Sequence, residues 1–366
     1  MASNKNQHFV PRCYLRAFAS DGGGAMTNVF NLTRRRLIPN APLKSQCSRS
    51  YFYGEDLFLE KALQKFEGPY AEMLREIRNP AYSLIERHAQ QLRAFWSLQH
   101  LRTEATSRRL VEASEEMNSD IGLEDDRYRV TQKEAIESSI KLVPEIFGHI
   151  EDLRLCLVRN ATDLPFVTSD HPAVSANRWH TQDVRARHTA PGLDSAGTLL
   201  LLPLTPRMLC LLYDGAVYSV TQSGGWVDVS SQEDVAAFNE HQYLNAQANV
   251  YFGDWRMAYE VERAFGHIAR RRPPSRHRFH YLVFDRRDGN GEVFREVDAE
   301  EARRHERSIV HQEAVYPEPS QWPRLLRYRP DGRYWSNGSG AGYSRRARIP
   351  AGSHGYRSFP TRRSTR

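Results

Sequence analysis

The sequence lacks a long hydrophobic run. No stretch approaches the roughly 18 apolar residues needed to span a bilayer, and the first residues carry Asn, Gln, His and Arg where a secretory signal needs an apolar core. Cysteine is scarce too: Cys13, Cys47, Cys156 and Cys210 are widely spaced and form no C-x-x-C pair. This usage favours free thiols in a reducing compartment, so we expect a cytoplasmic protein with no membrane partner.

The common catalytic and cofactor motifs are also absent. The chain has no Gly-rich phosphate loop ending in Lys-Ser/Thr, no G-x-G-x-x-G after a strand and no G-x-S-x-G nucleophile elbow. H-E-x-x-H is missing, as is any close cluster of Cys and His with zinc spacing. Because the phosphate loops are missing, we expect no nucleotide cofactor.

The basic character of the chain is confined to its end. The formal net charge is +7, but residues 317–366 carry eleven Arg against Glu318 and Asp331, which amounts to +9. The preceding 316 residues therefore sum to −2. Nucleic acid stays open as a partner, but the charge that would attract it lies in the tail and not in the body.

The tail itself has no apolar period and is rich in Arg, Gly, Ser and Pro. Such a segment buries too little surface to offset its chain entropy, so we expect residues 317–366 to be disordered. Three interpretations stay open. The tail is an Arg-rich arm that binds phosphates, an extension without a function, or sequence that is not native. The last is suggested by the ending "SFPTRRS", which resembles a translated sequencing adapter.

The body of 316 residues has the length and composition of one large or two intimate domains. We expect residues 1–316 to form a single large domain, with a helical part at about 54–150 and a strand-rich part at about 151–316. In the helical part, Leu59, Leu63 and Phe66 recur at i, i+4 and i+7. The pair Gly68-Pro69 is expected to break or kink this helix.

After residue 150 the pattern changes to short apolar runs such as "LRLCLVRN" and "GTLLLLPLTPRMLCLLYDG", bounded by Pro, Asp, Asn and Gly. A helix is expected between them at "SQEDVAAFNEHQYLNAQANVYF". Helices first and strands afterwards predict the α+β class. The expected arrangement is a helical N-terminal half packed against a smaller, strand-rich, mostly antiparallel C-terminal half.

The first candidate site residue is His8, in "QHFVP". Pro11 favours extended backbone before it, so His8 is expected to sit fixed at the mouth of an apolar region. Two roles stay open for its imidazole. It either makes structural hydrogen bonds within the fold or serves as a metal ligand or general base.

The second candidate is Asp170, in "PFVTSDHP", where an apolar run ends on an acid and an imidazole. Side chains at a strand end are held by the sheet yet open to solvent. Asp170 either ligates a divalent cation or orients a water, or it makes an Asx-turn beyond Pro172. His171 is expected to point to the other face because side chains alternate along a strand.

Helical residues complete the set of candidates. Glu60 and Glu67 are seven residues apart, hence on one side of an unbroken helix, although charges so placed usually form a solvated face. Gln99 and Arg102 interrupt or flank an otherwise buried helix at "FWSLQHLRTEA". Arg102 either clamps a phosphate or carboxylate or pairs with a structural acid such as one of these glutamates.

Five segments together resemble a known family: "NQHFVPRCYLRAF", "FYGEDLFLEKALQKFEG", "FVTSDHPAV", "LPLTPRMLCLLY" and "VAAFNEHQYLNAQANVYF". In this order they are similar to the uncharacterised bacterial family catalogued as domain of unknown function 4238, over roughly residues 6 to 255. The family pattern begins with His-aromatic-Val-Pro, matched from His8 to Pro11. It also has Thr/Ser-Asp-Asn-Pro, matched by Ser169, Asp170 and Pro172. His171 stands where the pattern usually has Asn, which weakens any role assigned to that side chain. The resemblance implies no reaction.

Two hypotheses follow from these residues. In the first, the protein is a metal-dependent hydrolase that uses Mg²⁺ or Mn²⁺ on a phosphate-containing substrate, nucleic acid included. In the second, the same residues form a buried polar network, and the protein is a binding or sensor module that recognises its ligand elsewhere. The first hypothesis assigns catalysis to His8, Asp170 and Glu67, metal binding to His8, Asp170 and Glu60, and substrate binding to Arg102 and Gln99.

Overall fold

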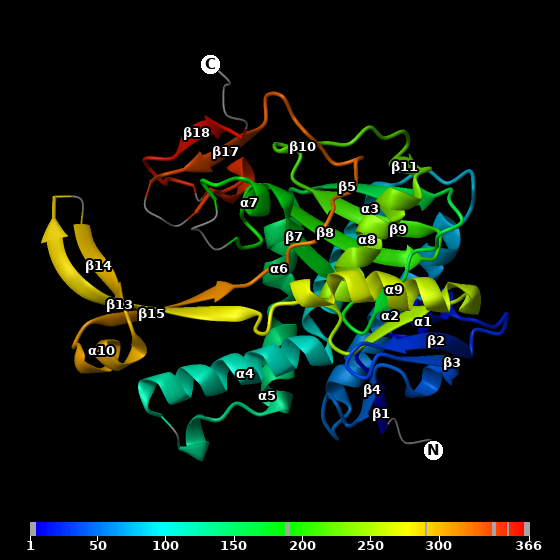
Figure 1. Cartoon of the computed structure of the whole chain (residues 1–366), viewed down its shortest axis with the longest axis horizontal. Helices are drawn as coiled ribbons and strands as arrows, with labels where there is room; N and C mark the ends of the chain where they lie inside the picture. The colour runs from blue at the N-terminus through cyan, green and yellow to red at the C-terminus, as the bar shows by residue number, and fades with distance from the viewer. Residues whose placement is uncertain are drawn as a thin grey trace.

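A computed structural model describes residues 5–123, 125–186, 191–289, 291–338, 342–349 and 351–361 (Figure 1). Its α-helices are α1 Arg12–Leu15, α2 Phe58–Ile77, α3 Glu86–Leu101, α4 Glu104–Ile121, α5 Gln132–Lys141, α6 Val143–Ile150, α7 Arg178–Gln182, α8 Gln232–Asn245, α9 Ala258–Ile268 and α10 Ala299–Arg304. Across these described ranges, no helix combines the length and the apolar character that a membrane crossing requires.

The largest sheet has five strands in the order β11-β5-β9-β8-β7. Their bounds are β5 Arg154–Asn160, β7 Val174–Asn177, β8 Thr198–Thr205, β9 Met208–Tyr213 and β11 Trp226–Val229. The β11–β5 pair is parallel and the other pairs in this sheet are antiparallel. Every residue of β8 and β9 is buried, which is why these two strands read as continuous apolar runs.

Both faces of this sheet are covered. Side chains from α2 and α3, such as Leu74 and Leu92, pack with Leu200 and Leu212 on one face. On the other face Leu199 packs in a cluster that includes residues of α8. The central sheet therefore lies between two layers.

A second sheet has the order β3-β2-β12-β6 and joins distant parts of the chain. Its strands are β2 Met26–Asn31, β3 Arg36–Pro42, β6 Thr168–Ser169 and β12 Asn249–Phe252. The predicted arrangement of a helical N-terminal half against a smaller strand-rich half is therefore wrong, although the class is α+β. The N-terminal residues supply strands, because β2 pairs antiparallel with β12 from beyond residue 240, and α8 and α9 lie in the C-terminal part.

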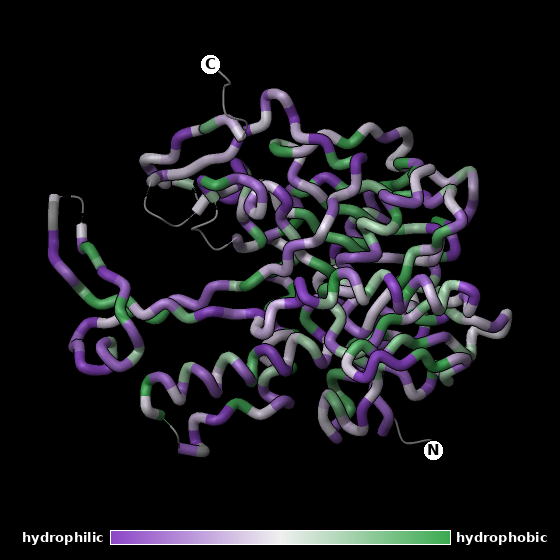
Figure 2. Tube along the Cα trace, viewed as in Figure 1, coloured by the Kyte–Doolittle hydropathy of each residue, from purple (hydrophilic) through white to green (hydrophobic). Residues whose placement is uncertain are grey.

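A three-stranded arm projects from the body at the left of Figure 1. It consists of β13 His277–Asp288, β14 Gly291–Val297 and β15 Ser308–Ala314, with β13 in the centre. Figure 2 shows long hydrophilic stretches along this arm. Its own apolar cluster is small, with Tyr281, Val283 and Ala302 buried, and Ile121 of α4 packs against it.

The expected break at Gly68-Pro69 is absent, because α2 runs unbroken through Pro69. Both residues are exposed. The carbonyl that the proline leaves without an N–H donor can therefore bind water, so the proline is tolerated on this side of the helix.

The expected disorder of residues 317–366 is not confirmed. The described tail residues form β16 Arg327–Tyr328, β17 Arg333–Ser336 and β18 Arg357–Pro360. The remaining short strands are β1 Asn6–His8, β4 Ser48–Ser50 and β10 Tyr218–Ser219, and β10 pairs with β16. Leu326 and Tyr334 are buried in the cluster on the α8 side of the central sheet. The division at residue 316 stays a prediction.

Candidate functional site

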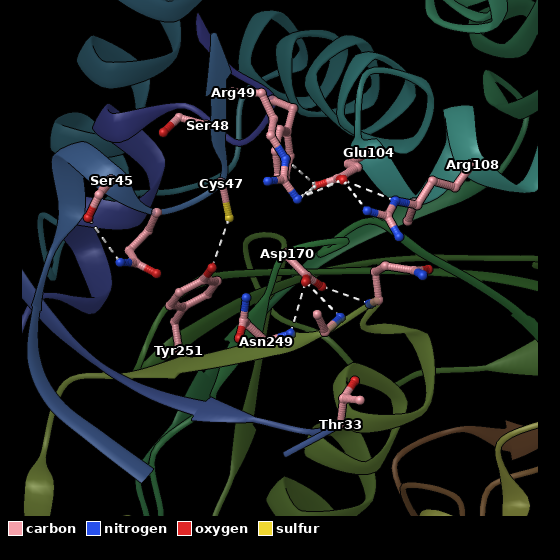
Figure 3. Close-up of a pocket in the computed structure, with 15 residues that line it drawn as sticks. Thr33, Ser45, Cys47, Ser48, Arg49, Glu104, Arg108, Asp170, Asn249 and Tyr251 are labelled. Atoms are coloured by element: carbon pink, nitrogen blue, oxygen red, sulfur yellow. Dashed lines mark hydrogen bonds and ion pairs between the residues drawn. The ribbon is translucent and has the colours of Figure 1, made fainter. Parts of the chain in front are cut away.

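Asp170 follows directly on the short strand β6, and its carboxylate holds a loop. Oδ1 accepts the N–H of Gln247 at 2.8 Å, and Oδ2 accepts those of Ala248 and Asn249, both at 2.8 Å (Figure 3). Burial raises the pKa of Asp170 to about 6, while the same three N–H groups act to lower it. The carboxylate therefore fixes the connection between α8 and β12.

A polar cavity of about 290 Å³ lies beside Asp170 (Figure 3). The Glu104 carboxylate on its wall is shared between Arg49 at 2.9 Å and Arg108 at 2.7 Å. Cys47 donates to the hydroxyl of Tyr251 at 3.2 Å, and burial raises the pKa of this thiol well above its ordinary value. In this cavity the charge of Glu104 is therefore balanced by two arginines, and the thiol of Cys47 stays protonated and unreactive.

Arg102 organises the candidates near the N-terminus. Its guanidinium donates to Glu67 at 3.2 Å, to the hydroxyl of Tyr53 at 3.0 Å and to the carbonyl of His8 at 2.8 Å. Arg102 is 1% exposed. His8 thus takes part through its main chain and not its imidazole, and Arg102 pairs with a structural acid.

Gln99 and Glu60 lie beside this network. Gln99 donates to the carbonyl of Phe9 at 2.9 Å, so its amide ties α3 to the N-terminal segment. Glu60 accepts from Gln64 at 3.2 Å, and burial raises the pKa of Glu60. The structure therefore brings His8, Glu67 and Arg102 together, with Gln99 bonded to the next carbonyl.

The described residues contain no group of three or more His, Cys, Asp or Glu side chains that could hold a metal ion. The set of His8, Asp170 and Glu60 does not form such a group. The oxygens of Asp170 are directed at three backbone N–H groups, and His8 is bound through its carbonyl. The metal site stays a prediction that no ligand cluster in the described ranges supports.

On the other side of the Asp170–His171 segment, three arginines converge on the C-terminal carbonyls of α8. Arg109 donates to Asn245 at 3.3 Å, Arg272 to Ala246 at 2.6 Å, and Arg276 to Leu244. We call Arg109, Arg272 and Arg276 the arginine cluster. A helix C-terminus carries partial negative charge and unpaired carbonyls, so it is a natural place for cations.

A cavity of about 220 Å³ opens against this cluster. We call it the arginine pocket, and its walls include His100, Arg109, His171, Asn245, Arg276 and Tyr316. His171 orients Arg109, because the guanidinium donates to its Nε2 at 3.3 Å while its Nδ1 bonds the hydroxyl of Thr103 at 2.7 Å. Burial lowers the pKa of His171 well below its usual range, so this imidazole is neutral.

The arginine cluster has more positive charge than its surroundings neutralise. Within the described residues, none of the three arginines forms an ion pair with a carboxylate. Burial lowers the pKa of Arg109 to about 10 and that of Arg276 to about 9. Asp170 acts on Arg109 and Arg272 from a distance, and Glu112 on Arg109. Even with Asp170 and about half a charge from the helix end, a positive excess remains.

Comparison with known proteins places the chain in a family. The family model described as "Protein of unknown function (DUF4238)" matches residues 6–255, which is more than half of the chain. The chain belongs to DUF4238. No curated protein and no solved structure matches this DUF4238 protein. The matched range includes Asp170 and Arg109, whereas Arg272 and Arg276 lie beyond it.

Sequence reasoning missed His100 and the arginine cluster. One signal for Arg109 was present: Ala105 and Ala113 lie four residues to either side, on the same face of α4, and both are buried. Arg108, its neighbour, faces solvent with a side chain 47% exposed. Arg272 and Arg276 gave no such signal, because their burial depends on α8, which lies elsewhere in the sequence.

Proposed function

We propose that this protein binds a phosphate-containing ligand in the arginine pocket. The observation that carries the proposal is the pair of half-buried guanidinium groups, Arg109 and Arg276, that line one cavity without a carboxylate partner among the described residues. A buried charge without compensation is costly. A bound anion offsets that cost.

Phosphate suits this pocket better than a metal or a cation does. Guanidinium groups present planar forks of N–H donors that match the oxygens of a phosphate. Tyr316 and Asn245 add polar side chains to the wall. The residual positive charge of the three arginines, roughly one and a half units after Asp170 and the helix end are counted, is complementary to a phosphate monoanion or dianion.

This proposal has an enzymatic form, in which the protein hydrolyses the bound ligand with the help of Mg²⁺ or Mn²⁺. The alternative is a binding or sensor module, and one observation favours it: the network around Arg102 is buried and internally bonded. Both forms require the same ligand. We also place the protein in the cytoplasm, which fits its four free cysteines.

Thermal unfolding of the full chain with inorganic phosphate, pyrophosphate or chloride at matched ionic strength tests the proposal. Phosphate and pyrophosphate should raise the unfolding temperature, because a ligand at 100 times its Kd adds about 3 kcal/mol to the free energy of unfolding. Chloride should have little effect. Equal shifts with all three salts would show general screening and contradict a site for phosphate.

The same experiment with EDTA, Mg²⁺ and Mn²⁺ separates the enzymatic form from the binding form. A rise that requires one of these metals together with phosphate shows a metal-dependent site, which the enzymatic form requires. A phosphate shift that EDTA leaves unchanged supports metal-free recognition.

A further inference from the structure

His100 stands at the C-terminal end of α3 and lines the arginine pocket. Its ring packs against two others. Trp96 stacks on it with ring centroids 4.7 Å apart and planes at 13°, and His171 lies 5.8 Å away at 29°. Trp96 is itself fixed, since its indole N–H donates to the carbonyl of Leu201 at 3.3 Å. The orientation of the His100 ring is therefore set by packing.

The protonation of His100 follows from its partner. Nδ1 lies 3.2 Å from the carbonyl oxygen of Ala173. A carbonyl can only accept, so Nδ1 carries the hydrogen and Nε2 carries the lone pair. Burial lowers the pKa of His100 to about 4, and Arg109 acts in the same direction. The imidazole is thus neutral at physiological pH.

The other two imidazoles of the pocket are engaged at both nitrogens. His171 bonds Thr103 and Arg109, and His277 bonds Glu116 at 2.8 Å and Ser275 at 3.3 Å. Among the hydrogen bonds of the described residues, His100 takes part through Nδ1, and none involves its Nε2. His100 therefore differs from the other two in keeping an unengaged lone pair on a ring that lines the pocket.

We propose that Nε2 of His100 is a nucleophile toward the phosphoryl group of a phosphate monoester held by Arg109 and Arg276. This inference rests on the proposed function, since it requires that phosphate binds in the arginine pocket. It names an activity that needs no metal. The two guanidinium groups neutralise the phosphoryl oxygens, which otherwise repel an incoming lone pair.

The reaction balances with water as the second substrate. The Nε2 lone pair forms an N–P bond while the P–O bond to the alcohol breaks, and the leaving oxygen keeps that electron pair and takes a proton from water. A water molecule then attacks phosphorus, the N–P bond breaks, and its electron pair returns to Nε2. The products are the free alcohol and inorganic phosphate, and His100 is regenerated.

The test uses the full chain with p-nitrophenyl phosphate and phosphoramidate as small phosphoryl donors, in EDTA. Wild type should release phosphate and form a phosphohistidine that is lost in acid and survives in base. Peptide mass spectrometry should place it at His100. His100→Asn should form none and lose turnover at least 100-fold, and its amide can still donate to the carbonyl of Ala173, which keeps the local fold. The exposed His267 provides a matched control, and His267→Asn should behave as wild type.

The outcomes separate this inference from the proposed function. If wild type binds phosphate but forms no phosphoenzyme from either donor, His100 is not a nucleophile. Turnover that persists in His100→Asn leads to the same conclusion. In both cases the proposed phosphate-binding site is unaffected. Failure of wild type to bind inorganic phosphate overturns both. If His100→Asn fails to fold, peptide mapping of the wild-type phosphoenzyme decides, since a phosphoryl group on any other residue contradicts the inference.

Discussion

The buried Arg102 and the half-buried Arg109 illustrate how the partners of an arginine determine its role. Arg102 meets Glu67, a tyrosine hydroxyl and a backbone carbonyl, so its charge is balanced within the fold. Arg109 meets a neutral imidazole and a helix-end carbonyl, so its charge is not. The sequence led us to consider Arg102 as the ligand clamp. The geometry instead supports Arg109 in that role and makes Arg102 a structural residue.

Replacing Arg102 should therefore destabilise the protein without affecting phosphate binding. Arg102→Gln removes the charge and leaves Glu67 and the carbonyl of His8 without their donor. Breaking a buried pair in this way costs about 3 kcal/mol. Urea unfolding measures that loss. Arg75→Gln is the control, because Arg75 and its partner Glu72 are both more than two-thirds exposed and such pairs contribute about 0.5 kcal/mol.

An equal and small effect of both substitutions would contradict the structural role of Arg102. If the Arg102→Gln protein is folded but no longer binds phosphate, Arg102 instead contributes to ligand binding.

At the scale of elements, the sequence predicted local structure better than long-range pairing. The apolar stripe from Leu59 predicted α2, and the apolar run "GTLLLLPLTPRMLCLLYDG" predicted strands, which β8 and β9 form. The pairing of β2 with β12 could not be predicted, because it joins Asn31 to Asn249 and no local pattern encodes it. The arginine cluster could not be predicted for the same reason, because its three members come from separate segments that meet only at the end of α8.

Besides the β10–β16 pair and the packing of Leu326 and Tyr334, one buried arginine holds the tail to the body. Arg345 is 2% exposed and donates to both oxygens of Asp152, at 2.8 and 3.0 Å. It also donates to the carbonyl of His149 at 2.6 Å. These bonds fix the tail next to the end of α6, where composition alone had predicted disorder.

Arg345→Gln should lower the free energy of unfolding by about 3 kcal/mol, because Asp152 loses most of its partners in a buried setting. The exposed Arg357, also in the tail, is the matched control, and Arg357→Gln should change stability by less than about 0.5 kcal/mol. Limited proteolysis should cut the tail of the Arg345 variant faster. If both variants unfold and digest as wild type does, the tail is not anchored by Arg345.

At the scale of the whole molecule, the arginine pocket lies where several parts of the chain meet. His100 and Arg109 come from α3 and α4, His171 follows β6, and Asn245 ends α8. Arg276 immediately precedes β13, at the base of the arm (Figure 1). A ligand held between Arg109 and Arg276 would therefore link the helical part of the body to the arm.

The central claim is tested most directly by isothermal titration calorimetry with inorganic phosphate. The proteins compared are wild type, Arg109→Gln, Arg276→Gln and Arg270→Gln. Gln keeps an amide donor for the α8 carbonyls and removes only the charge, and Arg270 is an exposed arginine outside the pocket. We predict that wild type and Arg270→Gln bind phosphate alike, and that each pocket variant binds it at least about tenfold more weakly, since a charged hydrogen bond is worth about 1.5 kcal/mol or more. Equal binding by all four proteins, or no binding by wild type, would contradict the account.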